Sequence, residues 1–148
     1  MNDLANRYLT PSGLDTIMNR VFKTLPGLGL GVGGSRVLAV RGRKSGEWRT
    51  TMVNLLIVDD TRYLVAPRGH TDWVKNLRAA GGGELRLGRK AEPFTARELS
   101  DAEKLPALHA YLDRWGWELG RFFEGLDKNS SDAELAAIAP GFPVFQLS

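Results

Sequence analysis

Short strand-like segments separated by turns recur between residues 36 and 97, and another lies at the C-terminal end of the sequence. Alternating apolar and polar residues, bounded by glycine and aspartate, predict strands at 36–41, 47–58, 62–66, 84–87, 93–97 and 143–147. Short strands in meander order with a few peripheral helices are typical of an α+β fold, here a small antiparallel barrel. The chain of 148 residues fits one such domain.

The clearest predicted helix is N-terminal, at 11–25, where apolar residues recur at helical spacing. We expect this amphipathic helix, within residues 1–25, to pack on the barrel, and a lipid-facing or substrate-facing role stays an open alternative. The glycines of 29–34 formally satisfy G-x-G-x-x-G. A dinucleotide site needs a strand before those glycines and a helix after them. Here the order is reversed, so a flexible link is expected instead.

Three more helices are predicted, at 72–80, 100–115 and 131–139. Thr71 is expected to cap the first of them, and Gly81–Gly83 to end it. Ser100 and Glu103 form a capping box at the start of the second. These helices are expected to lie outside the barrel, at its periphery.

Composition excludes several kinds of site. The chain has no cysteine and two histidines, so neither a disulfide nor a structural zinc or other metal site is expected. Neither H-E-x-x-H nor G-x-S-x-G occurs. If the protein is an enzyme, its reactive atom therefore belongs to a bound cofactor, and no side chain is predicted to be catalytic. No apolar run reaches the ~18–20 residues of a membrane span, and no secretory signal is evident. We expect a cytoplasmic protein, with peripheral membrane association through helix 11–25 left open.

The strongest local motif is the basic turn of residues 41–49, Arg-Gly-Arg-Lys-Ser-Gly-Glu-Trp-Arg. Gly42 and Gly46 allow a tight backbone that exposes amides to an anion. Lys44 offers a compact charge, Arg49 a planar fork and Ser45 a neutral donor. The motif predicts an anion site, and a turn with solvated charges is the alternative.

A second motif follows about twenty residues later, between residues 66 and 79. A strand ends at Ala66, a loop carries Arg68, and a helix start presents free amides. Trp73 could stack on a flat ring or anchor the core, and Asn76 lies on the same helical face.

Together the two motifs, Gly-Arg-Lys-Ser-Gly-x-x-Arg and the loop with Trp-x-x-Asn-Leu-Arg-Ala, resemble the deazaflavin-dependent nitroreductase family over about residues 35–98. The resemblance implies a single split-barrel domain that uses reduced coenzyme F-420. It implies hydride transfer from C5 of the deazaflavin to a quinone or a nitro or enone acceptor. The positions it assigns to the cofactor are Arg43, Lys44, Ser45, Arg49, Met52, Ala66, Pro67, Arg68, Gly69, Trp73, Asn76 and Leu77.

Two of these positions depart from the family pattern. Met52 stands where the family usually has proline, and Pro67 replaces a small or hydroxylated residue in the loop beside the ring. Proline cannot donate a backbone amide, so a ring contact made by that amide elsewhere is absent here.

An apolar acceptor would suit a wall formed by Tyr111 and Trp115, four residues apart on one helix, although this pattern is more typical of ordinary core. Other functions stay open: a binding protein for deazaflavin or an apolar ligand without turnover, and a reductase that uses FMN. A nucleic-acid partner is not expected, because the net charge is only +3 and no basic, aromatic-studded sheet is present. Split barrels occur as monomers and as homodimers, so the oligomeric state is not predicted.

Overall fold

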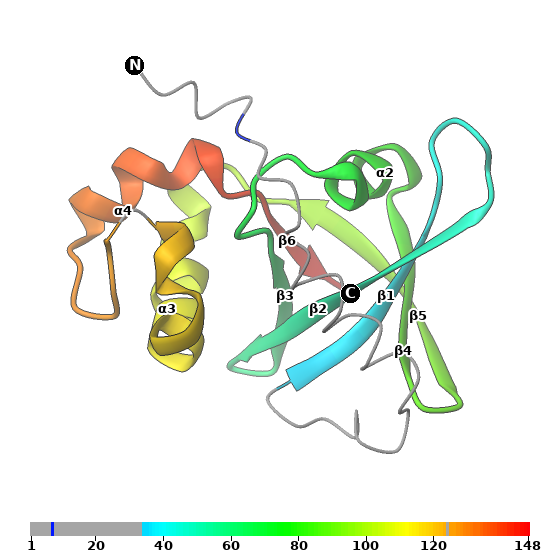
Figure 1. The fold of residues 1–148 in the computed structure, drawn as a ribbon, viewed down its shortest axis with the longest axis horizontal. Coiled ribbons are helices and arrows are strands. Elements are labelled where there is room, and N and C mark those ends of the chain that lie inside the picture. Colours follow the sequence, from blue (N-terminus) through cyan, green and yellow to red (C-terminus); the bar gives the residue numbers. More distant parts are fainter. Residues whose placement is uncertain (1–6, 8–33, 124) are drawn as a thin grey trace.

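The computed structural model describes residue 7 and residues 34–123 and 125–148. Six strands form a closed barrel in the order β1-β2-β3-β6-β5-β4, and every neighbouring pair is antiparallel (Figure 1). The strands are β1 (Ser35–Arg41), β2 (Trp48–Val58), β3 (Thr61–Val65), β4 (Gly82–Leu87), β5 (Lys90–Glu98) and β6 (Val144–Leu147). The predicted α+β class with a small antiparallel barrel is confirmed. The expected meander order is wrong, because β4 pairs with β1 and β6 lies between β3 and β5.

Alternation along the strands separates the barrel interior from its surface. Leu38 and Val40 of β1 lie in one apolar cluster with Leu64 of β3 and Phe145 of β6. In an antiparallel pair, residues directly opposite each other point to the same face of the sheet. The pairs Leu55 with Leu64 and Leu64 with Phe145 therefore face inward together. β6 belongs to this interior although it is distant in sequence from both of its neighbours.

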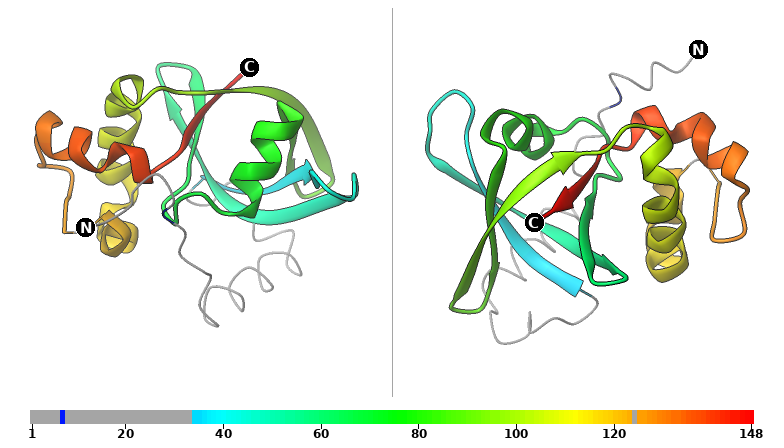
Figure 2. Two further views of the ribbon diagram at one scale, coloured as in Figure 1. Left: turned by 90° about the horizontal axis from the view of Figure 1, so that it is seen from above. Right: turned by 180° about the vertical axis from the view of Figure 1, so that it is seen from behind.

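The helical segments are α2 (Asp72–Ala80), η3 (Ala102–Lys104), α3 (Leu105–Leu119), η4 (Gly120–Phe123), α4 (Asp132–Ile138) and η5 (Ala139–Gly141). α2 lies across one end of the barrel, where Val74 and Leu77 join the interior cluster (Figure 2). The segments from η3 to η5 lie together on one side of the barrel (Figure 1). None of the helices in the described part of the chain has the length and apolar character of a membrane span.

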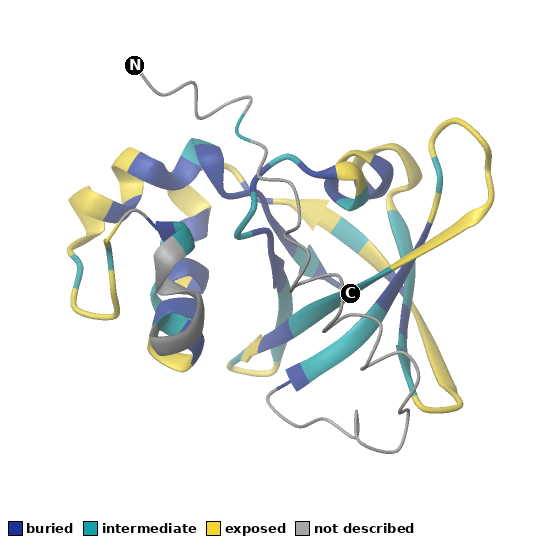
Figure 3. Cartoon of the chain, in the orientation of Figure 1, coloured by how far each residue is buried: buried dark blue, intermediate teal, exposed yellow. Residues whose placement is uncertain are grey.

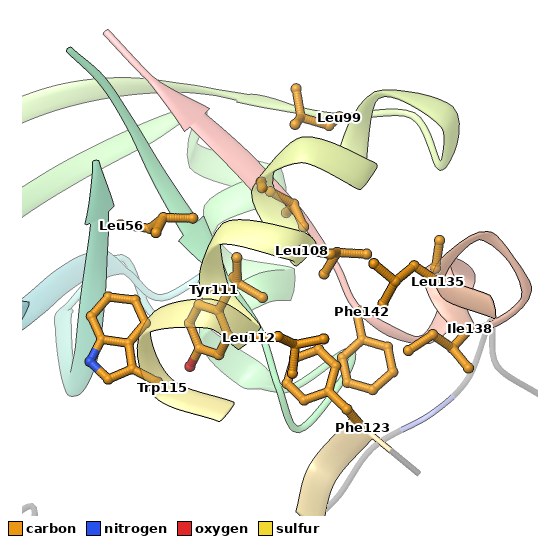
Figure 4. Packing of buried hydrophobic residues seen from close by; sticks show 14 residues of the cluster. Leu56, Leu99, Leu108, Tyr111, Leu112, Trp115, Phe123, Leu135, Ile138 and Phe142 are labelled. Atoms are coloured by element: carbon orange, nitrogen blue, oxygen red, sulfur yellow. The ribbon is translucent and has the colours of Figure 1, made fainter. Parts of the chain in front are cut away.

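A second apolar cluster fills the space between α3, α4 and the barrel (Figure 4). Phe123 and Phe142 stack with ring centroids 4.4 Å apart and are fully buried. Tyr111 contacts Phe123 at 5.8 Å and Trp115 at 5.0 Å between ring centroids. This aromatic group fixes η4 and η5 beside the barrel, and its own packing needs no bound ligand.

Two details around α2 correct the prediction. Thr71 occupies the N-cap position, but its hydroxyl makes no capping hydrogen bond. Only Gly81 ends the helix: it is left-handed, with φ of 75°, and its amide donates to the Leu77 carbonyl at 2.8 Å. Gly82 and Gly83 belong to β4, where they pair with Thr95 and Phe94 of β5. A Cβ atom at Gly83 would lie 2.5 Å from the Ala39 carbonyl oxygen. Gly82 and Gly83 therefore allow close contact between strands and do not take part in ending the helix.

The helix expected at 100–115 is divided. The Ser100 amide donates to the Glu103 carboxylate at 3.0 Å, as the capping box predicts, but η3 comes first and α3 begins only at Leu105. Pro106 then lies in the first turn of α3, where a missing amide is tolerated. α4 begins after Ser131 with a complete capping box. The expected helix 11–25 and most of the glycine link lie outside the described residues, as does the membrane contact that depended on them.

Replacing Glu103 with glutamine should lower the thermal midpoint slightly at neutral pH. The Ser100 amide, the Arg97 guanidinium and the Ser100 hydroxyl hold the pKa of Glu103 below its ordinary value of 4.5. A carboxylate whose pKa is depressed by folding stabilises the native state above the unfolded pKa, and this contribution is lost as the pH falls through the folded pKa. Thermal denaturation of both proteins should therefore show a difference at neutral pH that vanishes once the pH has fallen below the lowered pKa of Glu103. A difference that persisted in acid would contradict the assignment.

Candidate functional site

The hairpin between β1 and β2 extends beyond the barrel beside α2, and its tip is exposed (Figures 1 and 3). The Gly42 amide donates to the Glu47 carbonyl, and the Gly46 amide to the Gly42 carbonyl, both at 2.8 Å. Gly46 adopts φ of 74°, which favours glycine. Ser45 Oγ accepts the Glu47 amide at 3.2 Å. The turn is therefore closed by its own hydrogen bonds, and Lys44 and Arg49 on it are exposed.

Lys44 and Arg49 are exposed cations, and neither forms an ion pair or hydrogen bond within the described residues. Arg49 lies opposite Val40, so the two side chains share a face of the hairpin. Val40 clusters with Val74 and Leu77 of α2, which shows that this face is the one covered by the helix. The hairpin therefore carries two exposed positive charges: Arg49 on the face that adjoins α2, and Lys44 in the turn.

Arg43 has a different role, because it joins the hairpin to α2. Its amide and its Nη1 both donate to Asn76 Oδ1, at 3.1 and 2.7 Å, and its Nη2 lies 3.6 Å from the Asp72 carboxylate. Asn76 is only 5% exposed. The resemblance assigns Asn76 to the cofactor, and in the structure its side-chain oxygen already accepts two hydrogen bonds from the hairpin.

Replacing Asn76 with alanine should destabilise the protein by about 1–3 kcal/mol, because a buried acceptor of a charged hydrogen bond is lost. Cofactor affinity should also fall, although Lys44 and Arg49 are untouched, since the hairpin would no longer be held against α2. Chemical denaturation and a binding titration measure the two effects. Asp72→Asn is the matched control: it removes only an exposed ion pair and should cost about 0–1 kcal/mol.

The loop between β3 and α2 adjoins the start of α2, as the hairpin does. The Ala66 amide donates to the Pro143 carbonyl at 2.9 Å, and the Gly69 amide to the Ala66 carbonyl at 3.1 Å. Pro67 and Arg68 are half-buried, and the Arg68 guanidinium lies 5.6 Å from the centre of the Phe122 ring. The loop leads directly into α2, so its backbone and the first amides of the helix lie side by side.

Thr71 stands at this junction. Its Oγ1 is buried and has no hydrogen-bond partner within the described residues. Buried hydroxyls are almost always hydrogen-bonded, so an unsatisfied one calls for an explanation. An oxygen atom of a ligand at the start of α2 would supply the missing partner.

The remaining predicted cofactor residues are not all brought to one surface. Trp73 is half-buried, with its ring 6.1 Å from Phe145 at a tilted angle. Leu77 is buried in the barrel cluster. Met52 pairs with Val37, so it faces the opposite side of the sheet from Arg49. The structure therefore gathers the hairpin tip, the loop and the start of α2, and leaves Met52 and Leu77 apart from them.

Tyr111 and Trp115, the predicted wall for an acceptor, lie in the second apolar cluster (Figure 4). They are 2% and 4% exposed. This placement agrees with the core role that the sequence also allowed.

Both histidines are engaged elsewhere. His70 places Nε2 at 3.0 Å from the Pro140 carbonyl and Nδ1 at 3.0 Å from Arg78 Nη2. Arg78 in turn forms a bidentate pair with Glu98 at 2.7 and 2.6 Å. His109 lies 2.6 Å from Asp132, between α3 and α4. Within the described residues, no group of three acidic or histidine side chains is placed to hold a metal ion.

A family model described as F420H(2)-dependent quinone reductase matches residues 17–115, more than half of the chain. The chain belongs to this family. The matched span contains the basic hairpin, the loop after β3 and α2. Membership in the F420H(2)-dependent quinone reductase family confirms the relation to deazaflavin-dependent oxidoreductases that the two motifs indicated.

Solved structures share the fold of this family member. An F420-H2 dependent reductase (FDR-A) superposes with a TM-score of 0.54 at 19% identity and covers 78% of this chain and 94% of that one. A domain-swapped dimer gives 0.56 at 19% identity and covers 93% and 100%. A protein of unknown function from Agrobacterium tumefaciens gives 0.56 at 17% identity and covers 95% and 57%. At these identities the similarity shows the split-barrel fold alone. A search of curated protein sequences finds no match.

Proposed function

We propose that the protein binds reduced coenzyme F-420 between the basic hairpin and the start of α2, and reduces an apolar acceptor such as a quinone. The observation that carries the proposal is the pair of exposed cations, Lys44 and Arg49, without intramolecular partners in the described part of the chain. Cations in folded proteins usually gain from a nearby carboxylate when one is available. Their freedom here fits an anionic ligand.

The residues present fit the anionic part of this cofactor. Coenzyme F-420 carries a phosphate and an oligoglutamate tail, and Lys44 and Arg49 supply a point charge and a bidentate fork for such groups. The first amides of α2 and the unsatisfied Thr71 hydroxyl supply neutral donors at the same place. The loop from Ala66 to Gly69 and the half-buried Trp73 would lie along the ring.

When bound, the reduced coenzyme supplies the hydride from its C5 position. The protein's own residues bind and orient it. Both ring nitrogens of His70 have partners, so this histidine is not a free acid or base for the reaction. Arg68 lies on the loop that is proposed to run along the ring, and its guanidinium would stabilise negative charge that develops on an acceptor bound there.

The acceptor is proposed to be a quinone, in keeping with the family, and a nitro or enone compound is the second candidate. FMN is the alternative cofactor, and a role in binding without turnover is the alternative function. One of the similar structures is a domain-swapped dimer, so this chain is proposed to act as a monomer or a homodimer. Sedimentation would distinguish these two states.

The test is a titration of intrinsic tryptophan fluorescence with coenzyme F-420 and, separately, with FMN. The bound, reduced coenzyme is then mixed with menadione, and its oxidation is followed by absorbance. We expect binding of coenzyme F-420 and rapid oxidation on addition of the quinone. Binding of FMN alone would overturn the cofactor assignment. Binding of coenzyme F-420 without oxidation by menadione or by a nitro compound would favour a carrier protein.

A further inference from the structure

Arg7 lies against the loop that joins β3 to α2, although it is 60 residues from Pro67 in the sequence. Its Nη1 donates to the carbonyls of Pro67 at 2.8 Å and Gly141 at 3.2 Å. Its Nη2 donates to the Phe122 carbonyl at 2.8 Å. One guanidinium therefore connects the loop, η4 and η5.

The backbone of residue 7 makes a second connection. The His70 amide donates to the Arg7 carbonyl at 2.6 Å. Gly69 is buried with φ of 89°, and a Cβ atom there would collide with the Arg7 carbonyl. The loop is therefore shaped to receive this residue, since both the conformation and the lack of a side chain at Gly69 are required for the close approach.

Arginine suits this position in a way that lysine does not. The planar guanidinium directs several donors in one plane and can stack on an aromatic ring at the same time. Its central carbon lies 4.1 Å from the centre of the Phe142 ring. The guanidinium thus reaches the Pro67 carbonyl from one side while its face lies against an aromatic ring. Removing the guanidinium would take a donor from three carbonyls at once.

We propose that Arg7 is a positioning residue, which holds residues 66–70 in the conformation that receives the cofactor ring. This proposal rests on the function proposed above. Arg7 connects to the loop through Pro67, Gly69 and His70, whereas Lys44 and Arg49 belong to the hairpin between β1 and β2. The anionic tail of the cofactor would therefore still be gripped when Arg7 is lost, while the ring side would not be ordered.

The first measurement needs no cofactor. Hydrogen exchange of the backbone amides at residues 69–71 should accelerate about tenfold or more in Arg7→Ala, because the loop opens locally more often. Arg7→Lys keeps the charge without the planar fork and should give an intermediate rate. Arg114→Ala is the matched control: it removes another arginine that stacks on an aromatic ring, 4.9 Å from Trp115, but lies on α3 away from the loop. Its exchange in this loop should equal the wild type.

The second measurement uses coenzyme F-420. Arg7→Ala should weaken binding about tenfold and slow hydride transfer to menadione, and guanidinium ion at low millimolar concentration should restore part of both by filling the vacated space. Methylammonium should not restore them. This rescue separates positioning of the loop from a general loss of stability, which added guanidinium would only worsen.

Unchanged exchange at residues 69–71 in both Arg7 variants would overturn the proposal. So would faster exchange with unchanged affinity and hydride transfer. If the wild-type protein does not bind coenzyme F-420, the proposed function and the cofactor role of Arg7 fail together. The exchange rates would still show whether Arg7 holds the loop. The two failures are therefore distinguishable.

Discussion

Replacing Lys44 and Arg49 together with alanine should weaken binding of coenzyme F-420 about a hundredfold or more, because charge-assisted hydrogen bonds contribute roughly 1.5–3 kcal/mol each. Each single variant should lose about tenfold or more. The fold should be unaffected, since both side chains are exposed and neither has a partner within the described residues. A titration at two salt concentrations measures the effect. The salt dependence should be smaller in the variant, because fewer charge pairs would remain to be screened.

The control for this variant is the turn between β4 and β5. Arg89 and Lys90 are exposed cations there. Because β4 is antiparallel to β1, the β4–β5 turn lies at the other end of the barrel from the β1–β2 turn. Replacing both residues with alanine therefore removes the same charge at a distant place. Affinity of the control should stay within about twofold of the wild type, because screening weakens distant surface charges. Equal losses in both double variants would mean that general charge attraction, and not the hairpin site, binds the ligand.

Replacing Trp115 with alanine should destabilise the protein by about 3–5 kcal/mol, as expected for loss of a buried aromatic side chain. The ring lies 5.0 Å from the Tyr111 ring, and its edge is 3.1 Å from where a Cβ atom of Gly34 would lie. Such close packing on several sides leaves a cavity when the indole is removed. Chemical denaturation measures the loss, and Trp115→Phe, which keeps a ring, should lose less.

The same pair of variants tests whether Trp115 also contacts an acceptor. If Trp115 serves only the core, Trp115→Phe should reduce menadione at the wild-type rate once it is folded. A changed preference among quinones of different size, with cofactor affinity intact, would instead indicate that Trp115 contacts the acceptor. It would support the acceptor wall that the spacing of Tyr111 and Trp115 suggested. Stability and acceptor preference are thus read from one set of proteins.

Most of the barrel was predictable because hairpins are local. The β1–β2 turn, the β2–β3 turn and the helix after β3 are all marked by glycine, aspartate or a change in period, and the structure has them within a few residues. The pairing of β6 with β3 and β5 was not predictable from such signals. It depends on which strand edges remain free after the hairpins have formed, and no local pattern records that.

The candidate site also has local features that the sequence predicts and long-range contacts that it does not predict. The basic hairpin was visible in the sequence as a run of charges around two glycines. The bond from Arg43 to Asn76 was not, because it joins segments 33 residues apart. Arg7 gave no signal at all, since its partners are carbonyl oxygens, which every residue has. The position of Met52 could have been predicted. It lies three residues after Arg49 on one strand, and residues three apart on a strand point to opposite faces of the sheet. Strand alternation alone would have separated it from Arg49.

The insertion of β6 between β3 and β5 has a consequence for how the protein acquires its shape. Until β6 arrives, two strands present unpaired amides and carbonyls, which are the kind of edge that joins neighbouring molecules. Pairing over so long a stretch of chain is slow compared with hairpin formation. We therefore expect a period in newly made molecules during which self-association competes with completion of the barrel. Mutations that delay the arrival of β6 would lower the yield of the native protein without weakening it once formed.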